Sequence, residues 1–206
     1  LNPIIKNDNK FKDFISKFDI PADKKIILFP GRLTEWKGQI NFLKILEHYK
    51  NKKIICYFVG DIKKQSYTTK LVNEINKRQL GDYCKITGQL SHEDLRLMYI
   101  CADVVISAPL KPEGFGRVIS ECLAMKKIIL SYNYGGAKEQ LDGLSSIFKI
   151  TPLDQFELKN KIDKVLELSN SYKQEIGFIS RKHVINNFSK EKMLQGYLDF
   201  YQNTVL

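Results

Sequence analysis

The sequence predicts an α/β domain with a doubly wound parallel sheet of about six strands and flanking helices. Short apolar runs rich in β-branched residues recur along the chain, and such runs are typical of strands buried on both faces of a parallel sheet. Segments with helical spacing of apolar residues separate these runs, which begin about 20 to 30 residues apart. That interval accommodates a crossover helix between parallel strands, so the alternation indicates a Rossmann-like architecture.

The predicted strands are the six apolar runs, at residues 26–29, 54–59, 84–87, 104–107, 128–131 and 146–150. Helices are predicted between and after them, at residues 39–49, 67–80, 93–101, 116–125, 137–141, 154–168, 170–186 and 190–203. Ser91 and Asp94 form a capping-box pattern, in which Ser91 accepts from a backbone N–H three residues on and the Asp94 carboxylate reaches back. Residues 1–20 are predicted to be a linker-like start, and 21–206 one domain that is all-helical from about residue 154.

Composition and charge exclude several classes of protein. The 206 residues are 43% hydrophobic, enough for a core, which excludes a disordered chain, and no apolar run approaches the ~18 residues of a membrane span. The formal charge of +10 raises the alternative of a non-catalytic basic module that binds nucleic acid or an anionic membrane. The lysines are scattered among acidic residues, so a solvated surface is favoured and no nucleic-acid partner is expected. The four cysteines match neither a metal clip nor a disulfide framework, which indicates reduced core thiols in the cytoplasm.

The loop after the first predicted strand carries the first candidate site. Ligands of open parallel sheets bind beyond the carboxyl ends of the strands, so these loops are where function is expected. Gly31 and Gly38 permit close backbone approach, while Arg32 and Lys37 place two cations beside the amino end of a helix, which itself favours an anion. The loop therefore predicts a phosphate or diphosphate site. Taken alone, this loop is equally consistent with a surface loop in which both cations are solvated.

The loop after the fourth predicted strand carries two glutamates, Glu113 and Glu121, eight positions apart. Gly114 and Gly116 make a flexible turn before the helix, so the backbone N–H groups of residues 115–118 would meet a phosphate. The flanking carboxylates would accept hydrogen bonds from the hydroxyls of a sugar. The alternative is that both glutamates form salt bridges, to Arg117 and Lys37.

Other loops give weaker signals. Gly135 and Gly136 precede a predicted helix and, taken alone, indicate a tight turn. Gly88 to Leu90 could line a base pocket with backbone groups. The three histidines lie far apart without a metal-binding spacing, so no metal site is predicted.

The order and spacing of these motifs resemble one family. The motifs are Gly31-Arg32-Leu33 with Lys37-Gly38, Val59-Gly60-Asp61, the segment from Glu113 to Glu121, and Gly135-Gly136 with Glu139. Over about residues 20–203 they resemble the donor-binding, carboxyl-terminal domain of a retaining GT-B glycosyltransferase of the group 1 (GT4) type. The Phe-Gly-Arg version of the glutamate motif is similar to that of enzymes that build lipopolysaccharide or other surface glycans.

The resemblance implies a nucleotide-diphosphate sugar as donor, of UDP, GDP or ADP type, and no further cofactor. The implied catalytic residues are Glu113, Arg32 and Lys37. The implied donor-binding residues are Gly31, Arg32, Lys37, Glu113, Gly114, Phe115, Gly116, Arg117, Val118 and Glu121. In these roles Arg32 and Lys37 hold the diphosphate, Glu121 takes the ribose hydroxyls, and Glu113 grips the hexose with the backbone of Gly114 and Phe115. The implied chemistry is displacement with retained anomeric configuration, with a helix dipole in place of a metal.

The resemblance also implies a partner. Enzymes of this family carry their acceptor site on an amino-terminal domain, toward which the closing helix packs, so this chain alone is expected to bind donor weakly and to transfer nothing. Acceptors in the family are often lipid-linked, which is compatible with peripheral contact at the inner face of the membrane. Lys126 and Ile128 depart from the small Gly and Pro usual after the signature helix. An epimerase or hydrolase on the same fold is the enzymatic alternative.

Overall fold

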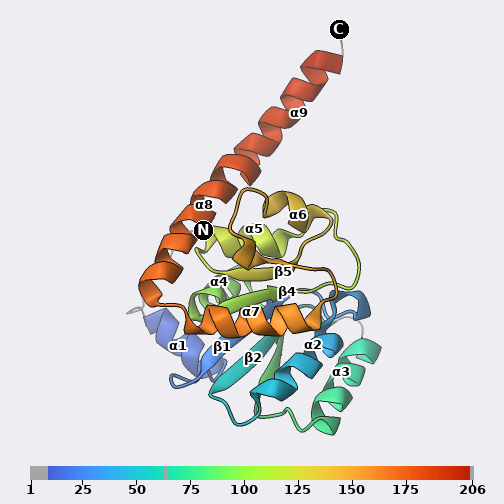
Figure 1. Cartoon of the computed structure of the whole chain (residues 1–206), viewed down its shortest axis with the longest axis vertical. Helices are drawn as coiled ribbons and strands as arrows, with labels where there is room; N and C mark the ends of the chain where they lie inside the picture. The colour runs from blue at the N-terminus through green and yellow to red at the C-terminus, as the bar shows by residue number, and fades with distance from the viewer. Residues whose placement is uncertain (1–8, 63–64, 205–206) are drawn as a thin grey trace.

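The computed structural model describes residues 9–62 and 65–204. Its centre is a six-stranded parallel sheet with strand order β3-β2-β1-β4-β5-β6 (Figure 1). The strands are β1 (Lys25–Pro30), β2 (Ile54–Val59), β3 (Cys84–Gly88), β4 (Val104–Ser107), β5 (Ile129–Tyr132) and β6 (Lys149–Ile150). In β1, Ile27 pairs with Cys56 of β2 on one side and with Val104 of β4 on the other. The strand order therefore reverses between β1 and β4, which confirms the predicted doubly wound fold.

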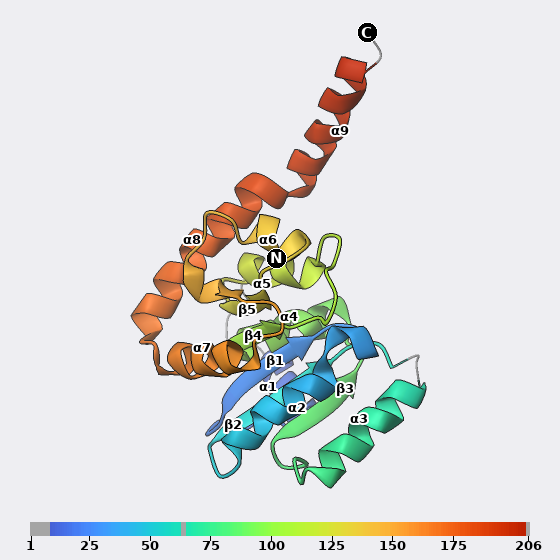
Figure 2. The ribbon, with the colours of Figure 1, turned by 45° about the vertical axis from the view of Figure 1, so that its right-hand side comes forward.

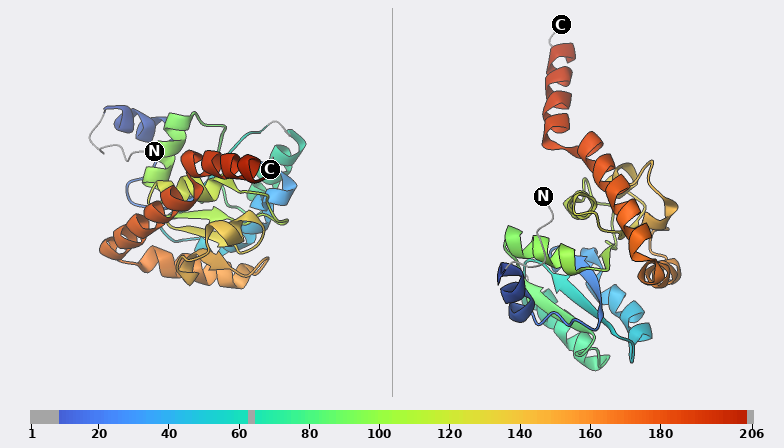
Figure 3. Two further views of the ribbon diagram at one scale, coloured as in Figure 1. Left: turned by 90° about the horizontal axis from the view of Figure 1, so that it is seen from above. Right: turned by 90° about the vertical axis from the view of Figure 1, so that its left-hand side faces the viewer.

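Helices cover both faces of the sheet. They are α1 (Asn9–Lys17), α2 (Gln39–Leu46), α3 (Gln65–Lys77), α4 (His92–Cys101), α5 (Arg117–Ala124), α6 (Gly136–Gln140), α7 (Gln155–Glu167), α8 (Asn170–Phe188) and α9 (Lys190–Thr204). Helices α1 and α4 contact each other on one side of the sheet, and α2 contacts α3 and α7 on the other (right-hand view of Figure 3). None of the helices described is long and apolar enough to cross a membrane.

The core lies on both faces of the central strands. Every residue of β2, β4 and β5 is buried, as is β1 apart from Lys25, in agreement with the continuous apolar runs of the sequence. On the α2 side, the rings of Phe29, Phe42 and Phe58 pack with centroids 5.2 to 6.5 Å apart. This packing fixes β1, β2 and α2 relative to one another, and so fixes the loop between β1 and α2.

Three elements differ from the predictions in kind, beyond shifts of their ends by one to three residues. The expected linker, residues 1–20, forms helix α1 from Asn9 to Lys17. The helix forms because the spacing of Phe11, Phe14 and Phe18 places one apolar face against the core. Residues 1–8 of the expected linker lie outside the described residues. The predicted strand 146–150 begins as a 3₁₀ turn, because the Ser145 hydroxyl accepts from the backbone N–H of Ile147, and only its last two residues join the sheet. The predicted helix 39–49 ends its α-helical part at Leu46 and closes as a 3₁₀ turn.

The cap of α4 confirms one half of the predicted capping box. The Ser91 hydroxyl accepts from the backbone N–H of Asp94 at 3.0 Å. The Asp94 carboxylate, expected to reach back to the cap, accepts instead from Lys17 of α1 at 2.9 Å. The long-range ion pair thereby ties α1 to α4.

The two last helices behave differently. Helix α8 packs along α5, whereas α9 continues beyond Ser189 and projects away from the rest of the molecule (Figures 1 and 2). Its large apolar side chains are exposed: Met193, Leu194, Tyr197, Leu198, Phe200 and Tyr201. Helix α9 therefore presents an apolar surface that no element of residues 9–62 and 65–204 covers.

Candidate functional site

A cleft of about 650 Å³ lies at the carboxyl ends of the strands, where the strand order reverses. Most of the residues predicted from the sequence to bind a donor line this cleft: Gly31, Arg32, Lys37, Glu113, Gly116, Arg117, Val118 and Glu121. Gly114 and Phe115 lie outside that lining. The loops after β1 and β4, distant in the sequence, are therefore brought to one place by the topology.

The loop between β1 and α2 is held by the neighbouring strand and by α2. The N–H of Gly31 donates to the carbonyl of Val59 at 2.8 Å, and a Cβ on Gly60 would lie 2.0 Å from the carbonyl oxygen of Gly31, so this approach requires glycine at position 60. The buried side chain of Gln39 donates to the carbonyl of Arg32 at 3.0 Å and accepts from the Tyr67 hydroxyl at 3.1 Å. Sequence reasoning missed Gln39, because its partners are fixed by tertiary packing.

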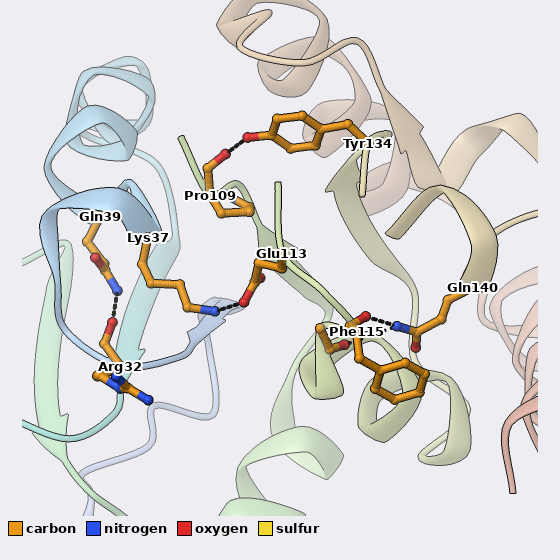
Figure 4. Close-up of polar contacts among 9 residues, drawn as sticks. Arg32, Lys37, Gln39, Pro109, Glu113, Phe115, Tyr134 and Gln140 are labelled. Atoms are coloured by element: carbon orange, nitrogen blue, oxygen red, sulfur yellow. Dashed lines mark hydrogen bonds and ion pairs between the residues drawn. The ribbon is translucent and has the colours of Figure 1, made fainter. Parts of the chain in front are cut away.

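Lys37 and Glu113 form an ion pair across the cleft (Figure 4). Their side chains are only 13% and 15% exposed, so water screens this pair less than a surface pair. The Lys37 ammonium also lies 4.6 Å from the centre of the Trp36 ring. The sequence left open the alternative that Glu113 forms a salt bridge, and the structure contains one between Glu113 and Lys37. Both of these residues were also predicted to bind a ligand. Because the pair lines the cleft, an anionic ligand would compete with Glu113 for Lys37.

Glu121 lies in the second turn of α5, beside the cleft. Its carboxylate accepts a hydrogen bond of 3.3 Å from the hydroxyl of Tyr99 on α4. Burial raises the pKa of Glu121 above its usual value, although the Tyr99 hydrogen bond opposes this effect. Burial also raises the pKa of Tyr99 far above its usual value, so its hydroxyl remains a donor. Sequence reasoning missed Tyr99, since nothing in the spacing links it to Glu121.

Residues 113–116, here called the α5 loop, pack closely against the start of α6. The N–H of Gly136 donates to the carbonyl of Glu113 at 2.9 Å. A Cβ on Gly136 would lie 2.1 Å from the carbonyl oxygen of Gly114, and one on Gly135 would lie 2.5 Å from that of Glu113. The Gly135–Gly136 pair therefore does more than make the tight turn predicted for it, because it lets α6 approach the α5 loop.

Phe115 points away from the cleft. Its ring lies 6.1 Å from the ring of Phe188 at the end of α8, and its carbonyl accepts from the Gln140 side chain (Figure 4). The half-exposed side chain of Phe115 thus contacts the end of α8 and does not line the cleft.

The amino end of α5 opens on the cleft. Gly116, with φ of +78°, precedes the helix, and the cleft is lined by Gly116, Arg117 and Val118. The first N–H groups of a helix have no acceptor within the helix, and the helix dipole makes that end favourable for an anion. Together with Arg32 and Lys37 this end forms a site suited chemically to a phosphate group.

The other walls of the cleft come from the end of β2 with the residues after it, and from the β3–α4 loop with the start of α4. The residues are Val59, Gly60, Asp61, Gln89, Leu90, Ser91, His92 and Leu95. Of the segment Gly88 to Leu90, which was predicted to line a base pocket, Gln89 and Leu90 lie in the wall of the cleft and Gly88 lies outside its lining. Over residues 9–62 and 65–204, no three His, Cys, Asp or Glu side chains gather in a group that could hold a metal ion.

Comparison with known proteins identifies the family. The family model described as glycosyl transferases group 1 matches residues 10–183. This chain belongs to that family. Among curated relatives, the glycosyltransferase chain is 24% identical to the lipopolysaccharide 1,2-N-acetylglucosaminetransferase of Salmonella typhimurium, over 91% of this chain and 50% of that protein. It is 26% identical to the alpha-D-kanosaminyltransferase of Streptomyces kanamyceticus, over 70% of this chain and 37% of that protein. The chain thus spans about half the length of such relatives, or less.

Solved structures also match this chain over about half of their own length. A glycosyltransferase from Rickettsia africae ESF-5 matches this glycosyltransferase chain with a TM-score of 0.87 and 34% identity, over 98% of this chain and 52% of that one. HepE of Anabaena, crystallised with UDP and glucose, matches with a TM-score of 0.81 and 24% identity, over 93% of this chain and 51% of that one. The second likeness, below 25% identity, shows the fold alone.

Proposed function

We propose that this chain is the donor-binding, carboxyl-terminal half of a retaining GT-B glycosyltransferase of the GT4 type. The observation that carries the proposal is the cleft at the reversal of strand order, where the Lys37–Glu113 pair, the amino end of α5 and Glu121 come together. Cations and helix N–H groups bind phosphates, whereas carboxylates bind sugar hydroxyls, so this combination suits a diphosphate with a sugar on each side. The complex of HepE with UDP and glucose supports a nucleotide sugar as the donor.

In the proposed complex the diphosphate lies between Arg32, Lys37 and the amino end of α5. Glu121 accepts from the ribose hydroxyls, and the ribose end of the cleft continues toward Gln89 and Leu90, whose backbone groups would face the base. Glu113 accepts from hydroxyls of the transferred hexose. Within this arrangement the ligand replaces the Lys37–Glu113 ion pair with two separate interactions, so each charged group gains a ligand partner as it loses the other.

In the proposed reaction, the bond between the anomeric carbon and the diphosphate oxygen breaks, and its electron pair leaves with the diphosphate. The acceptor hydroxyl bonds to the anomeric carbon on the same face, and its proton passes to the departing diphosphate. Arg32, Lys37 and the α5 dipole stabilise the negative charge that grows on the leaving group. Such charge stabilisation by groups already in place is often the largest contribution to catalysis.

The acceptor site would belong to an amino-terminal domain of the same protein, and we propose that α9 contacts it. The exposed apolar face of α9 and the coverage of about half of each relative support this arrangement. On this proposal the chain alone binds donor weakly and transfers no sugar. The relationship to a lipopolysaccharide N-acetylglucosaminetransferase supports a surface glycan or lipid-linked acceptor, in the cytoplasm or at the inner face of the membrane.

Calorimetric titration tests the donor-binding proposal. The chain is titrated with UDP, GDP and ADP and then with the matching nucleotide sugars, and the same series is repeated with the double variant Arg32→Ala/Lys37→Ala. We expect one nucleotide to bind best and its affinity to fall at least roughly tenfold in the variant, since two cations contact the diphosphate. Equal affinities in the parent chain and the variant would contradict the assignment of this loop.

A further inference from the structure

Gln140 is a fully buried residue of α6 that lies behind the α5 loop rather than in the cleft. Its side-chain nitrogen donates to the carbonyl of Phe115 and, at 3.4 Å, to the carbonyl of Gly116. Its side-chain oxygen lies 2.5 Å from the hydroxyl of Ser120 on α5. Because backbone carbonyls can only accept hydrogen bonds, the amide must turn its nitrogen toward the loop, which leaves its oxygen for Ser120.

The α5 loop thus turns three carbonyl groups toward α6. Gln140 binds those of Phe115 and Gly116, and the N–H of Gly136 binds that of Glu113. In a trans peptide the carbonyl and the N–H of the next residue point in opposite directions, and none of the described peptide bonds is cis.

The opposite side of the loop therefore carries the N–H groups of Gly114, Gly116 and Arg117. Figure 4 shows that Gln140 stands on one side of the loop and that Arg32 and Lys37 stand on the other, across the cleft. Successive N–H groups that point into one concavity form an anion-binding site. The direction of these N–H groups therefore depends on the donors that bind the carbonyl groups of the same peptides.

We infer that Gln140 is a positioning residue that orients the N–H groups of the α5 loop toward the diphosphate. The inference rests on the proposed function and deepens it, because it assigns phosphate recognition to a residue outside the cleft. Gly116 is the point where this control matters most, since glycine at φ of +78° tolerates alternative backbone conformations that a larger residue would resist. With the amide of Gln140 removed, the peptide group between Phe115 and Gly116 loses its donor, whereas the Gly116 carbonyl still accepts from the N–H of Ile119 at 2.9 Å.

The variant Gln140→Met tests this inference, because methionine keeps a similar volume and removes the donor. We expect its affinity for UDP and for pyrophosphate to fall on the order of tenfold, as for the loss of oriented hydrogen bonds to an anion. Its affinity for uridine, which has no phosphate, should stay unchanged. A merely structural role would weaken uridine and UDP alike.

Two further variants complete the design. Ser120→Ala removes the group that holds the Gln140 oxygen, so we expect a smaller loss of UDP affinity and again no change for uridine. Ser180→Ala is the matched control, because Ser180 is a fully buried hydroxyl that donates to the Ile176 carbonyl within α8, away from the loop. It should leave both affinities unchanged.

The outcomes separate this inference from the proposed function. If the parent chain binds UDP and the Met variant binds it equally well, the inference is overturned while the proposed function stands. If the Met variant does not fold, Ser120→Ala decides by the same comparison of UDP with uridine. If the parent chain binds pyrophosphate but none of UDP, GDP and ADP, and the Met variant loses pyrophosphate, the inference holds and the proposed function fails. Binding of neither pyrophosphate nor any of these nucleotides by the parent chain overturns both.

Discussion

At the scale of single residues, the pairing of Lys37 with Glu113 controls how the cleft can respond to a ligand. The two charges neutralise each other in a position largely screened from water. A diphosphate must draw Lys37 away, which leaves Glu113 with an uncompensated charge unless sugar hydroxyls replace the lysine. On the proposed function, the pair would couple recognition of the phosphate to recognition of the sugar, and we expect a nucleotide sugar to bind better than the nucleotide alone.

The variant Glu113→Gln should separate these two recognitions. Without the competing carboxylate, Lys37 binds phosphate more readily, so UDP affinity should be unchanged or up to about tenfold tighter. The preference for UDP-glucose over UDP should fall toward one. Calorimetry of both ligands checks this, with Glu35→Gln as the control, since Glu35 lies in the same loop as Lys37 but is exposed and pairs with Lys70. A loss of UDP affinity in Glu113→Gln would count against the coupling.

Glu121 should give donor binding a dependence on pH. Burial raises its pKa, so its carboxylate becomes protonated, and loses its capacity to accept from ribose, at a higher pH than an ordinary glutamate. For the same reason, burial of the ionised carboxylate lowers the free energy of unfolding at neutral pH. This destabilisation is lost as the pH falls from above the raised pKa to below the ordinary glutamate pKa. Affinity for UDP-glucose should therefore fall on acidification while pH is still above the ordinary glutamate pKa.

Two substitutions check that assignment in the same titrations. Glu121→Gln should bind more weakly at neutral pH and lose this part of the pH dependence. Tyr99→Phe removes the hydrogen bond that favours the ionised carboxylate, so the fall in affinity should begin at a higher pH than in the parent chain. An unchanged pH profile in both variants would rule out Glu121 as the titrating group.

At the scale of elements, the contact between α8 and the end of α5 depends on a glycine. A Cβ on Gly177 would lie 2.5 Å from the carbonyl oxygen of Lys126, which follows α5. Gly177→Ala should therefore lower the free energy of unfolding by about 1–3 kcal/mol, as overpacking does in other cores. Gly196→Ala in α9 is the control, because no atom lies within 4 Å of its added Cβ. Urea unfolding compares the two; equal stabilities would show that α8 is free to shift.

The elements show which parts of the fold local sequence determines. Buried strands and crossover helices follow from apolar runs and their spacing, so most were predictable. The face formed by Phe11, Phe14, Ile15 and Phe18 carried a helical signal for α1, which its polar neighbours obscured. The 3₁₀ turn before β6 depends on a single Ser145 hydrogen bond, which the apolar run 146–150 does not reveal.

The site was predictable in its lining but not in its support. Glycines, cations and carboxylates at strand ends carry chemical signals, so Arg32, Lys37 and Glu121 could be selected from the sequence. Gln140 and Tyr99 carry none, because their effects depend on partners 25 and 22 positions away that only the folded chain brings within reach.

At the scale of the whole molecule, α9 is the feature that most clearly suggests an interaction surface. Apolar groups that remain exposed over an entire helix are typical of interaction sites. Alone in solution, the chain should self-associate through this face in a concentration-dependent manner. Sedimentation velocity should show that Leu194→Gln/Tyr197→Gln/Tyr201→Gln lowers this association, whereas Lys192→Gln does not. A parent chain that stays monomeric at all concentrations would contradict this.

The cleft between the β1 and β4 loops is proposed to bind a nucleoside diphosphate. The most direct measurement is a crystal structure of the chain with the nucleotide that calorimetry selects. We expect phosphate oxygens within about 3 Å of the N–H groups of Gly116, Arg117 and Val118, contacts from Arg32 and Lys37, and the ribose against Glu121. A nucleotide bound elsewhere, for example among Lys126, Lys127 and Lys173 beside the amino ends of β4 and β5, would contradict it.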